Sequence, residues 1–124
     1  MEKYAWFKTF PGAIMATDAE GIISDMNDQC AGNYTKDGGY GLLGSNAIDC
    51  HQGAALEKAR RLWDEKVLNV YTLTKNGRKK LIYQAPYFVD GEFAGMVEMS
   101  LPLPDGEMPH FNRDKPQLNT DRTS

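Results

Sequence analysis

The sequence predicts a single α+β domain, a five-stranded antiparallel sheet with short helices and one longer helix on one face. Two observations carry this prediction. The turn signals Asn76-Gly77 and Asp90-Gly91 join three successive segments rich in Val, Tyr, Thr and Phe, which is typical of a β-meander. An amphipathic helix pattern precedes these strands, and a shorter strand pair opens the chain. A chain of 124 residues has room for one core of this kind but not for two.

The chain opens with an aromatic segment and a tight hairpin. Residues 1–10 form an aromatic arm that ends at Pro11, because proline stops a helix. The small apolar segment 13–17 predicts the first strand, and residues 22–26 predict the strand that returns beside it. Gly21 supplies the turn between them, since glycine readily adopts a positive φ.

The middle of the chain predicts helices of two kinds. Asn27 or Asp28 can cap a short helix, because either side chain can accept from the free backbone N–H groups of the first turn. Five glycines between residues 32 and 44 then predict a winding connection of brief turns. From residue 52 to residue 66, apolar residues recur at spacings of three and four with charged residues between them. One face of this longer helix should therefore lie against the sheet.

The remainder of the domain predicts three strands, over residues 67–75, 79–89 and 93–103. Pro86 falls inside the second of them. Proline cannot donate to a sheet ladder, so an edge, a bulge or a bend is expected near this residue. In the last strand four apolar side chains share one face, and we expect that face to meet the core. These four are Phe93, Val97, Met99 and Leu101.

Charge and composition argue against several kinds of partner. The net charge is −3 and the pI is about 5.3, so we expect no nucleic-acid partner. Arg78-Lys79-Lys80 is the one dense cationic cluster in the sequence. We expect it to lie in solvent where a strand leaves a turn. No segment has the apolar run of a signal peptide or a membrane span, so we expect a cytoplasmic protein without membrane contact. Both cysteines, Cys30 and Cys50, should then be reduced thiols.

Several short motifs accompany this element order. They are FPGAIMATD (residues 10–18), Gly21-Ile22-Ile23, Asn27, LGSNAIDCH (residues 43–51), Gly77 and DGEFAGMVE (residues 90–98). Together the element order and the motifs resemble the PAS family over roughly residues 10 to 103. The stretch 43–51 resembles a PAS subgroup with an Asp-Cys-His sequence before the long helix. The resemblance implies a curved sheet that cups a small hydrophobic cavity. It also implies a domain that senses a ligand, redox state or light, or that dimerises, and that passes a signal to an output domain.

The chain departs from many family members in two ways. No kinase, cyclase or DNA-binding segment follows residue 104, so we expect a separate output protein, unless the chain is an excised fragment. The sequence also lacks the Asn-Cys-Arg-Phe-Leu-like stretch of flavin-binding light sensors. The expected organisation is the arm at 1–10, a PAS-like domain at 11–104 and a flexible polar tail at 105–124.

A cavity between sheet and helices is the expected binding site. Its expected lining comes from inward positions of the strands and helices, or from their neighbours if the register differs by one residue. The candidates are Tyr34, Leu43, Ile48, Leu56, Tyr71, Ile82, Gln84, Val97 and Met99. The same residues could equally form a filled core, because any sheet face must be covered.

His51 is the candidate for holding a cofactor. A neutral imidazole beside a glycine-rich loop can ligate haem iron, or it can simply hydrogen-bond a loop carbonyl at a helix start. Zinc would need four ligands, and Cys30, Cys50 and His51 supply three. No arrangement of carboxylates, thiol or phosphate-binding glycines supports catalysis, so we expect the chain not to be an enzyme.

These observations leave two main hypotheses for function. The first is a PAS-type sensory domain that binds a small molecule and relays its occupancy to a partner protein. The second is a ligand-free PAS interaction module that acts through homodimerisation, with the aromatic arm as contact surface. A haem sensor that uses His51 is a third, weaker hypothesis.

Overall fold

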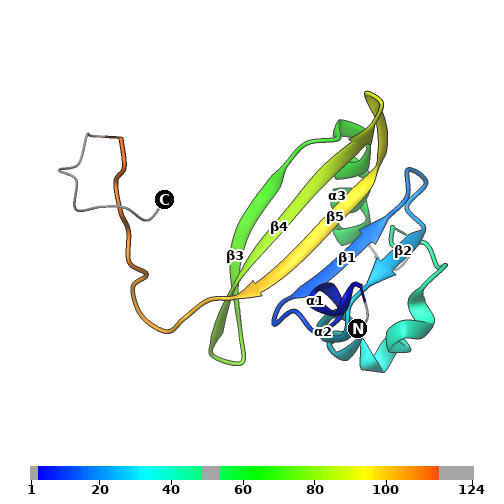
Figure 1. Ribbon diagram of the computed structural model, residues 1–124. Coiled ribbons are helices and arrows are strands. Elements are labelled where there is room, and N and C mark those ends of the chain that lie inside the picture. The colour runs from blue at the N-terminus through cyan, green and yellow to red at the C-terminus, as the bar shows by residue number, and fades with distance from the viewer. Residues whose placement is uncertain (1–2, 49–53, 115–124) are drawn as a thin grey trace.

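The computed structural model describes residues 3–48 and 54–114, and it contains one five-stranded antiparallel sheet with the strand order β2-β1-β5-β4-β3 (Figure 1). The strands are β1 (Ala13–Thr17), β2 (Ile23–Met26), β3 (Asn69–Lys75), β4 (Arg78–Val89) and β5 (Glu92–Pro102). The helices are α1 (Ala5–Lys8), α2 (Asp28–Asn33) and α3 (Ala54–Glu65), with two 3-10 turns, η1 (Thr35–Asp37) and η2 (Gly39–Leu42). The predicted fold class is confirmed.

The helices are distributed unevenly over the sheet. Figure 1 shows α3 behind β4 and β5, with α1 and α2 near the start of β1. We call the face covered by α2 and α3 the inner face and the opposite face the outer face. After β5 the chain leads away from the sheet, and residues 105–114 are exposed (Figure 1). The flexibility of the tail stays a prediction, and its last ten residues lie outside the described residues.

Both predicted hairpin turns are present. Asn76 and Gly77 have φ values of 53° and 74°, and Asp90 and Gly91 have values of 52° and 81°. A two-residue turn of this left-handed kind matches the twist of the strands that it joins, and asparagine, aspartate and glycine tolerate it best. The two turns fold β3, β4 and β5 into the expected meander.

Pro86 lies where β4 becomes an edge. The pairing of β3 with β4 begins at Asn69 opposite Gln84, so β3 does not reach Pro86, which faces Met96 of β5 on its other side. A register shift follows between Tyr87 and Phe88. The missing donor of proline is therefore not needed, and the predicted edge and bulge are both confirmed. Beyond this point β4 and β5 continue alone as a two-stranded ribbon.

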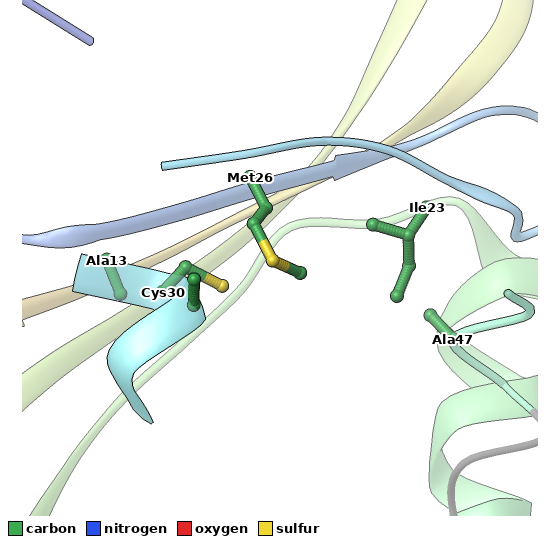
Figure 2. Close-up of a cluster of buried hydrophobic side chains, with 6 residues drawn as sticks. Ala13, Ile23, Met26, Cys30 and Ala47 are labelled. Carbon is green, nitrogen blue, oxygen red and sulfur yellow. The ribbon is translucent and has the colours of Figure 1, made fainter. Parts of the chain in front are cut away.

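The buried cluster of the N-terminal half joins α2 to β1 and β2 on the inner face. It consists of Ala13, Ile23, Met26, Cys30, Ala31 and Ala47, with Met15 and Leu42 packed against it. Figure 2 shows the side chains of Met26 and Ile23 directed to the same side, with Cys30 from α2 beside Ala13. Small side chains at the contact allow α2 to approach β1 closely, which fixes the helix over this end of the sheet.

Asn27 connects this cluster to the N-terminal arm. Its side chain is fully buried and makes four hydrogen bonds. The amide oxygen accepts from Ile14 N at 3.0 Å and, as the cap of α2, from Cys30 N at 3.1 Å. The amide nitrogen donates to Gly12 O at 2.8 Å and to Phe7 O at 3.1 Å. The predicted cap is confirmed, and one side chain holds arm, strand and helix together.

The prediction of which face of β5 meets the core was wrong. Glu98 pairs with Met15 of β1 and with Gln84 of β4, and all three lie on the inner face, which places Val97, Met99 and Leu101 on the outer face. Alternation separates the two faces of a strand but does not say which one is covered. Here the outer face is also apolar, with Ile14, Met99, Tyr83 and Val70 in one row across four strands.

The alternation of β5 is also interrupted near its start. Phe88 pairs with Phe93 and Tyr87 with Gly95, so Ala94 is an extra residue in β5. The ring of Phe93 lies 5.1 Å from the ammonium group of Lys66, which follows α3. Phe93 therefore does not share a face with the apolar residues further along the strand.

Gly95 permits a close approach of three strands. Its φ is 153°, and a Cβ at this position would lie 1.9 Å from Thr17 O and 2.9 Å from Tyr87 Cε1. The hydroxyl of Tyr87 passes over the glycine and donates to Thr17 O at 2.9 Å. The hydroxyl of Thr17 in turn accepts from Met96 N at 3.2 Å. This junction fixes the ends of β1, β4 and β5 to one another.

We expect Asn27→Ala to lower the free energy of unfolding by about 3 kcal/mol, because buried donors and acceptors on three elements lose their partner. Asn27→Asp keeps the two accepted bonds but places a carboxylate against two carbonyl oxygens. Burial should then raise its pKa in the folded state, so this variant should be most stable below about pH 4 and lose stability as the pH rises. Urea unfolding at pH 4 and pH 7 measures both effects, and an Asn27→Asp variant equal to the wild type at pH 7 would contradict the role of the amide donor.

We expect Gly95→Ala to destabilise the domain by about 2–4 kcal/mol, because the added methyl group meets backbone and the required φ disfavours alanine. Gly32→Ala is the matched control. Gly32 lies in α2 with no described atom near its added Cβ, so alanine there should stabilise the helix by up to about 1 kcal/mol. Thermal unfolding of both variants measures the difference, and equal midpoints would show that the junction can relax.

Candidate functional site

A cavity of about 200 Å³ lies between α3 and the inner face of the sheet. Its helix side comes from the face of α3 that the sequence pattern predicted, and its floor comes from four strands. Helix α3 contributes Ala59, Leu62 and Trp63, the loop before it contributes Ala47, and the sheet contributes Met15, Thr17, Tyr71, Gln84, Met96, Val97 and Glu98. The lining is mainly apolar with a few polar groups, which is typical of a small-molecule site.

The cavity opens into a wider groove of about 1010 Å³ along the inner face. The two share Met15, Ala47, Tyr71, Gln84 and Glu98. The groove adds side chains of α2 and of the loop after it, together with the β3–β4 hairpin. Those side chains include Cys30, Tyr34, Asp37, Leu73, Lys75, Arg78, Lys80 and Ile82. The cavity and the groove therefore border each other on the inner face.

A polar row on the inner face of the sheet reaches the floor of the cavity. Glu98 lies opposite Gln84, and Gln84 lies opposite Asn69 on the next strand. Asn69 Nδ2 donates to Gln84 Oε1 at 2.7 Å, which fixes the amide of Gln84 next to the carboxylate. Sequence reasoning missed Glu98 as a site residue. The available signal was a single carboxylate in the middle of the apolar strand formed by residues 96–101.

The ionisable groups around Glu98 are held in their neutral forms. Burial, and then the charge of Glu98, raises the pKa of the Cys30 thiol to about 11. The same two causes, in the same order, raise the pKa of Tyr34 to about 12, and they raise the pKa of Tyr71 as well. Cys30 is buried and is not part of a disulfide, so it is an inert thiol and not a nucleophile.

Trp63 brings an unsatisfied donor to the cavity wall. Its indole nitrogen is buried and has no hydrogen-bond partner in the part of the chain that the structure describes. A buried donor without an acceptor costs about 1–3 kcal/mol. Thr17, by contrast, uses its hydroxyl within the fold, since it accepts from Met96 N and donates to Asp18 O at 3.1 Å. Trp63 is therefore the wall residue whose polar group the fold leaves unused.

The structure brings some of the predicted site residues together. Four of them border the cavity or the groove, namely Tyr34, Tyr71, Ile82 and Gln84. Val97 also borders the cavity, although the alternation of β5 directs its side chain to the outer face. On β5 the neighbours allowed by a one-residue register change, Met96 and Glu98, line the cavity in place of Met99. Met15 and Thr17 of β1 line it as well. Trp63 of α3 was not among the candidates and is part of the wall.

The other predicted residues lie elsewhere. Leu43 is 43% exposed at the surface, and Met99 is on the outer face. Ile48 packs beside Gly21, where a Cβ would lie 3.2 Å from Ile48 Cδ1. His51 lies outside the described residues, and so does the side chain of Leu56. Their roles stay predictions.

Two further findings concern other classes of site. The described residues contain no group of three or more His, Cys, Asp or Glu side chains that could hold a metal ion. Among the helices that the structure describes, none is both long enough and apolar enough to cross a membrane.

Solved PAS domains have the same fold. The chain superposes on the PAS domain of BvgS from Bordetella pertussis with a TM-score of 0.55 and 19% identity, over 79% of this chain and 81% of that one. The PAS domain of an HTR-like protein from Haloarcula marismortui gives a TM-score of 0.56 and 15% identity, over 80% and 87% of the two chains.

A third similar structure is the Aer2 receptor of Vibrio cholerae, described as a dual PAS-heme oxygen sensor. Its TM-score is 0.57 with 17% identity, over 75% of this chain and 95% of that one. No protein-family model matches the chain, and no curated protein matches it in sequence. The chain therefore has a PAS-like fold, and at these identities the likeness concerns the fold alone.

Proposed function

We propose that this chain is a PAS-type sensory domain that binds a small molecule between α3 and the sheet and relays its occupancy to a separate partner protein. The observation that carries the proposal is the cavity itself, which is mainly apolar and has Glu98, Gln84 and Tyr71 converging on it. The PAS domains with the same fold support the sensory role. A signalling role without catalysis and a cytoplasmic location belong to the same proposal.

The size of the cavity limits the ligand. Sites for drug-sized molecules have volumes of roughly 300–1,000 Å³. The cavity under α3 is smaller, at about 200 Å³, so it suits a molecule with a single ring. A larger ligand would have to extend into the open groove.

The strand that forms the floor offers a route for the signal. Met96 and Glu98 of β5 face the cavity, and Val97 and Met99 alternate with them on the outer face. A ligand that shifts β5 or α3 therefore also changes the surface on the other side of the sheet. A partner protein that binds the outer face would respond to the change of this surface.

Native mass spectrometry of the freshly purified protein tests the proposal. We expect an additional mass that disappears on denaturation. Ala59→Leu should reduce it strongly, because Ala59 is buried and lines the cavity. Arg60→Leu is the matched control on the exposed side of α3 and should retain the mass.

The other outcomes also decide between hypotheses. An additional mass equal to haem, with a Soret band that His51→Ala removes, would support the haem sensor. A wild-type protein without additional mass in any preparation would contradict ligand binding and favour the interaction module.

Homodimerisation is the second candidate function, and the uncovered apolar surface favours it. Trp6 of α1 is 65% exposed, and its ring packs edge-on against Phe7 at 5.9 Å. Val70 and Tyr83 on the outer face are also exposed. Arm and outer face are continuous, because Phe10 and Leu101 both approach Gly12. A second copy could cover both at once.

Light scattering tests the dimer. We expect the wild type to have twice the chain mass of 13.9 kDa and Trp6→Ser to shift the protein toward the monomer. Phe111→Ser is the matched control, because Phe111 is an equally exposed aromatic residue after the sheet. A monomeric wild type, or the same loss of mass in both variants, would contradict a dimer formed through the arm.

A further inference from the structure

We propose that residues 109–114, which follow the sheet, dock as a sixth strand on the open edge of β3 and run antiparallel to it. This inference does not depend on a ligand in the cavity, so it goes beyond the proposed function. Four features of the described residues support it: the unpaired edge, the place where the chain leaves the sheet, the position of a proline and the charges at the β3–β4 hairpin.

The two edges of the sheet differ in how they are covered. At the β2 edge the chain returns, since Ile23 N donates to Ser45 O and Gly44 N donates to Ile23 O, both at 2.9 Å. The β3 edge is the last in the strand order and has no neighbouring strand within residues 3–48 and 54–114. It pairs with β4 without a register shift, and Lys75 at its end is its one charged residue. Natural proteins usually cover or interrupt such an edge, because it can pair with other chains.

The β3–β4 turn determines which backbone groups face this edge. Lys75 and Arg78 flank a two-residue turn, so they form a hydrogen-bonded pair of the ladder. Because hydrogen-bonded and non-hydrogen-bonded pairs alternate along antiparallel strands, every second residue of β3 directs its N–H and C=O away from β4. These residues are Val70, Thr72 and Thr74, and all three are exposed. An added strand would find a donor and an acceptor at each of them.

The chain leaves the sheet within reach of this edge. Leu103 N still donates to Lys79 O at 2.9 Å, and a bend follows at Gly106, which has a φ of 80°. Figure 1 shows the chain leaving on the side of β3 and then turning back in the direction opposite to β3. A strand beyond β3 would lie three strand spacings from β5, about 14 Å, and residues 104–109 can span about 20 Å. With this segment beside β3, the last four strands would have the spatial order of a Greek key.

Pro109 determines which residues of the segment can bond to β3. Proline has no N–H, so in an edge strand its nitrogen faces solvent. The residues at every second position after it then direct their N–H groups toward β3, and these are His110, Asn112 and Asp114. An antiparallel arrangement matches these three residues with the three outward-facing residues of β3.

The same register forms an apolar pair between the two strands. With His110 opposite Thr74, Phe111 lies opposite Leu73. Phe111 is 72% exposed in the extended segment of the structure, and Leu73 borders the groove on the inner face. An aromatic side chain opposite an aliphatic one stabilises a strand pair, so docking would give Phe111 a covered position.

Opposite charges meet at the hairpin end in this register. Lys75 lies directly opposite Arg78, and two like charges at such a pair repel each other. Pro109 would lie opposite Lys75 on the other side, which makes Glu107 the diagonal neighbour of Lys75. A glutamate can reach a lysine at this separation, so Glu107 would offset the repulsion.

Amide hydrogen exchange of the full-length protein, followed residue by residue by NMR, tests the added strand. We expect an alternating pattern, in which the N–H groups of Asn112 and Asp114 are protected about tenfold or more relative to those of Phe111 and Arg113. The N–H groups that β3 directs to the open edge should have the same protection. Exchange of all these groups at the rate of an unstructured chain would overturn the inference.

Two neighbouring proline substitutions test the register. Asn112→Pro removes a donor that faces β3, so the protection of Thr72 should be lost. Arg113→Pro is the matched control, because the N–H of Arg113 would face solvent, and Thr72 should stay protected. Both positions follow the last strand, so neither variant removes a bond of the described sheet. An equal effect of the two variants would overturn the inference, and protection that rises with protein concentration would do so as well, because it would assign the edge to a second copy.

Discussion

The arrangement of the N-terminal half depends on the side chain of Asn27. Its amide satisfies groups on the arm, on β1 and at the start of α2, and it does so without access to water. Because a buried amide must use all its donors and acceptors, the three elements hold one another in a single arrangement. The position of α2 then sets where Cys30 and Tyr34 border the groove. The inner-face groove and the exposed arm are therefore linked through one residue.

The second constraint is the difference in polarity between the two faces of the sheet. The inner face carries Glu98, Gln84 and Asn69 in one row, and the outer face carries an apolar row that the described helices leave mostly open. Polar groups at such a position need partners, and Asn69 supplies one to Gln84. The proposed ligand would lie on the polar row, and the proposed partner protein on the apolar outer face.

Turns, a helix cap and a strand edge could be predicted from the sequence. Which face of β5 the helices cover could not be predicted. The hairpin turns, the cap at Asn27 and the edge at Pro86 each follow from a property of one or two residues, and the structure contains all of them. Met99 was assigned to the wrong face because two-residue periodicity is symmetric between faces, and the decision lies in which face α3 covers. The extra residue Ala94 shifts the pattern once more. Glu98 was missed because its role depends on Gln84 and Trp63, which are distant in sequence.

The ribbon formed by the ends of β4 and β5 has a mechanical consequence. Thr17 holds its base through Tyr87 and Met96, so this contact acts as a fulcrum, with the cavity floor on one side and the exposed tip at Phe88 on the other. From the contact at Met96 to the start of β5 the strand spans about 13 Å, and from Met96 to Glu98 it spans about 7 Å. A rotation of about 5° at this contact would move the floor by about 0.6 Å and the tip by about 1 Å, so the ribbon doubles a small displacement at the floor.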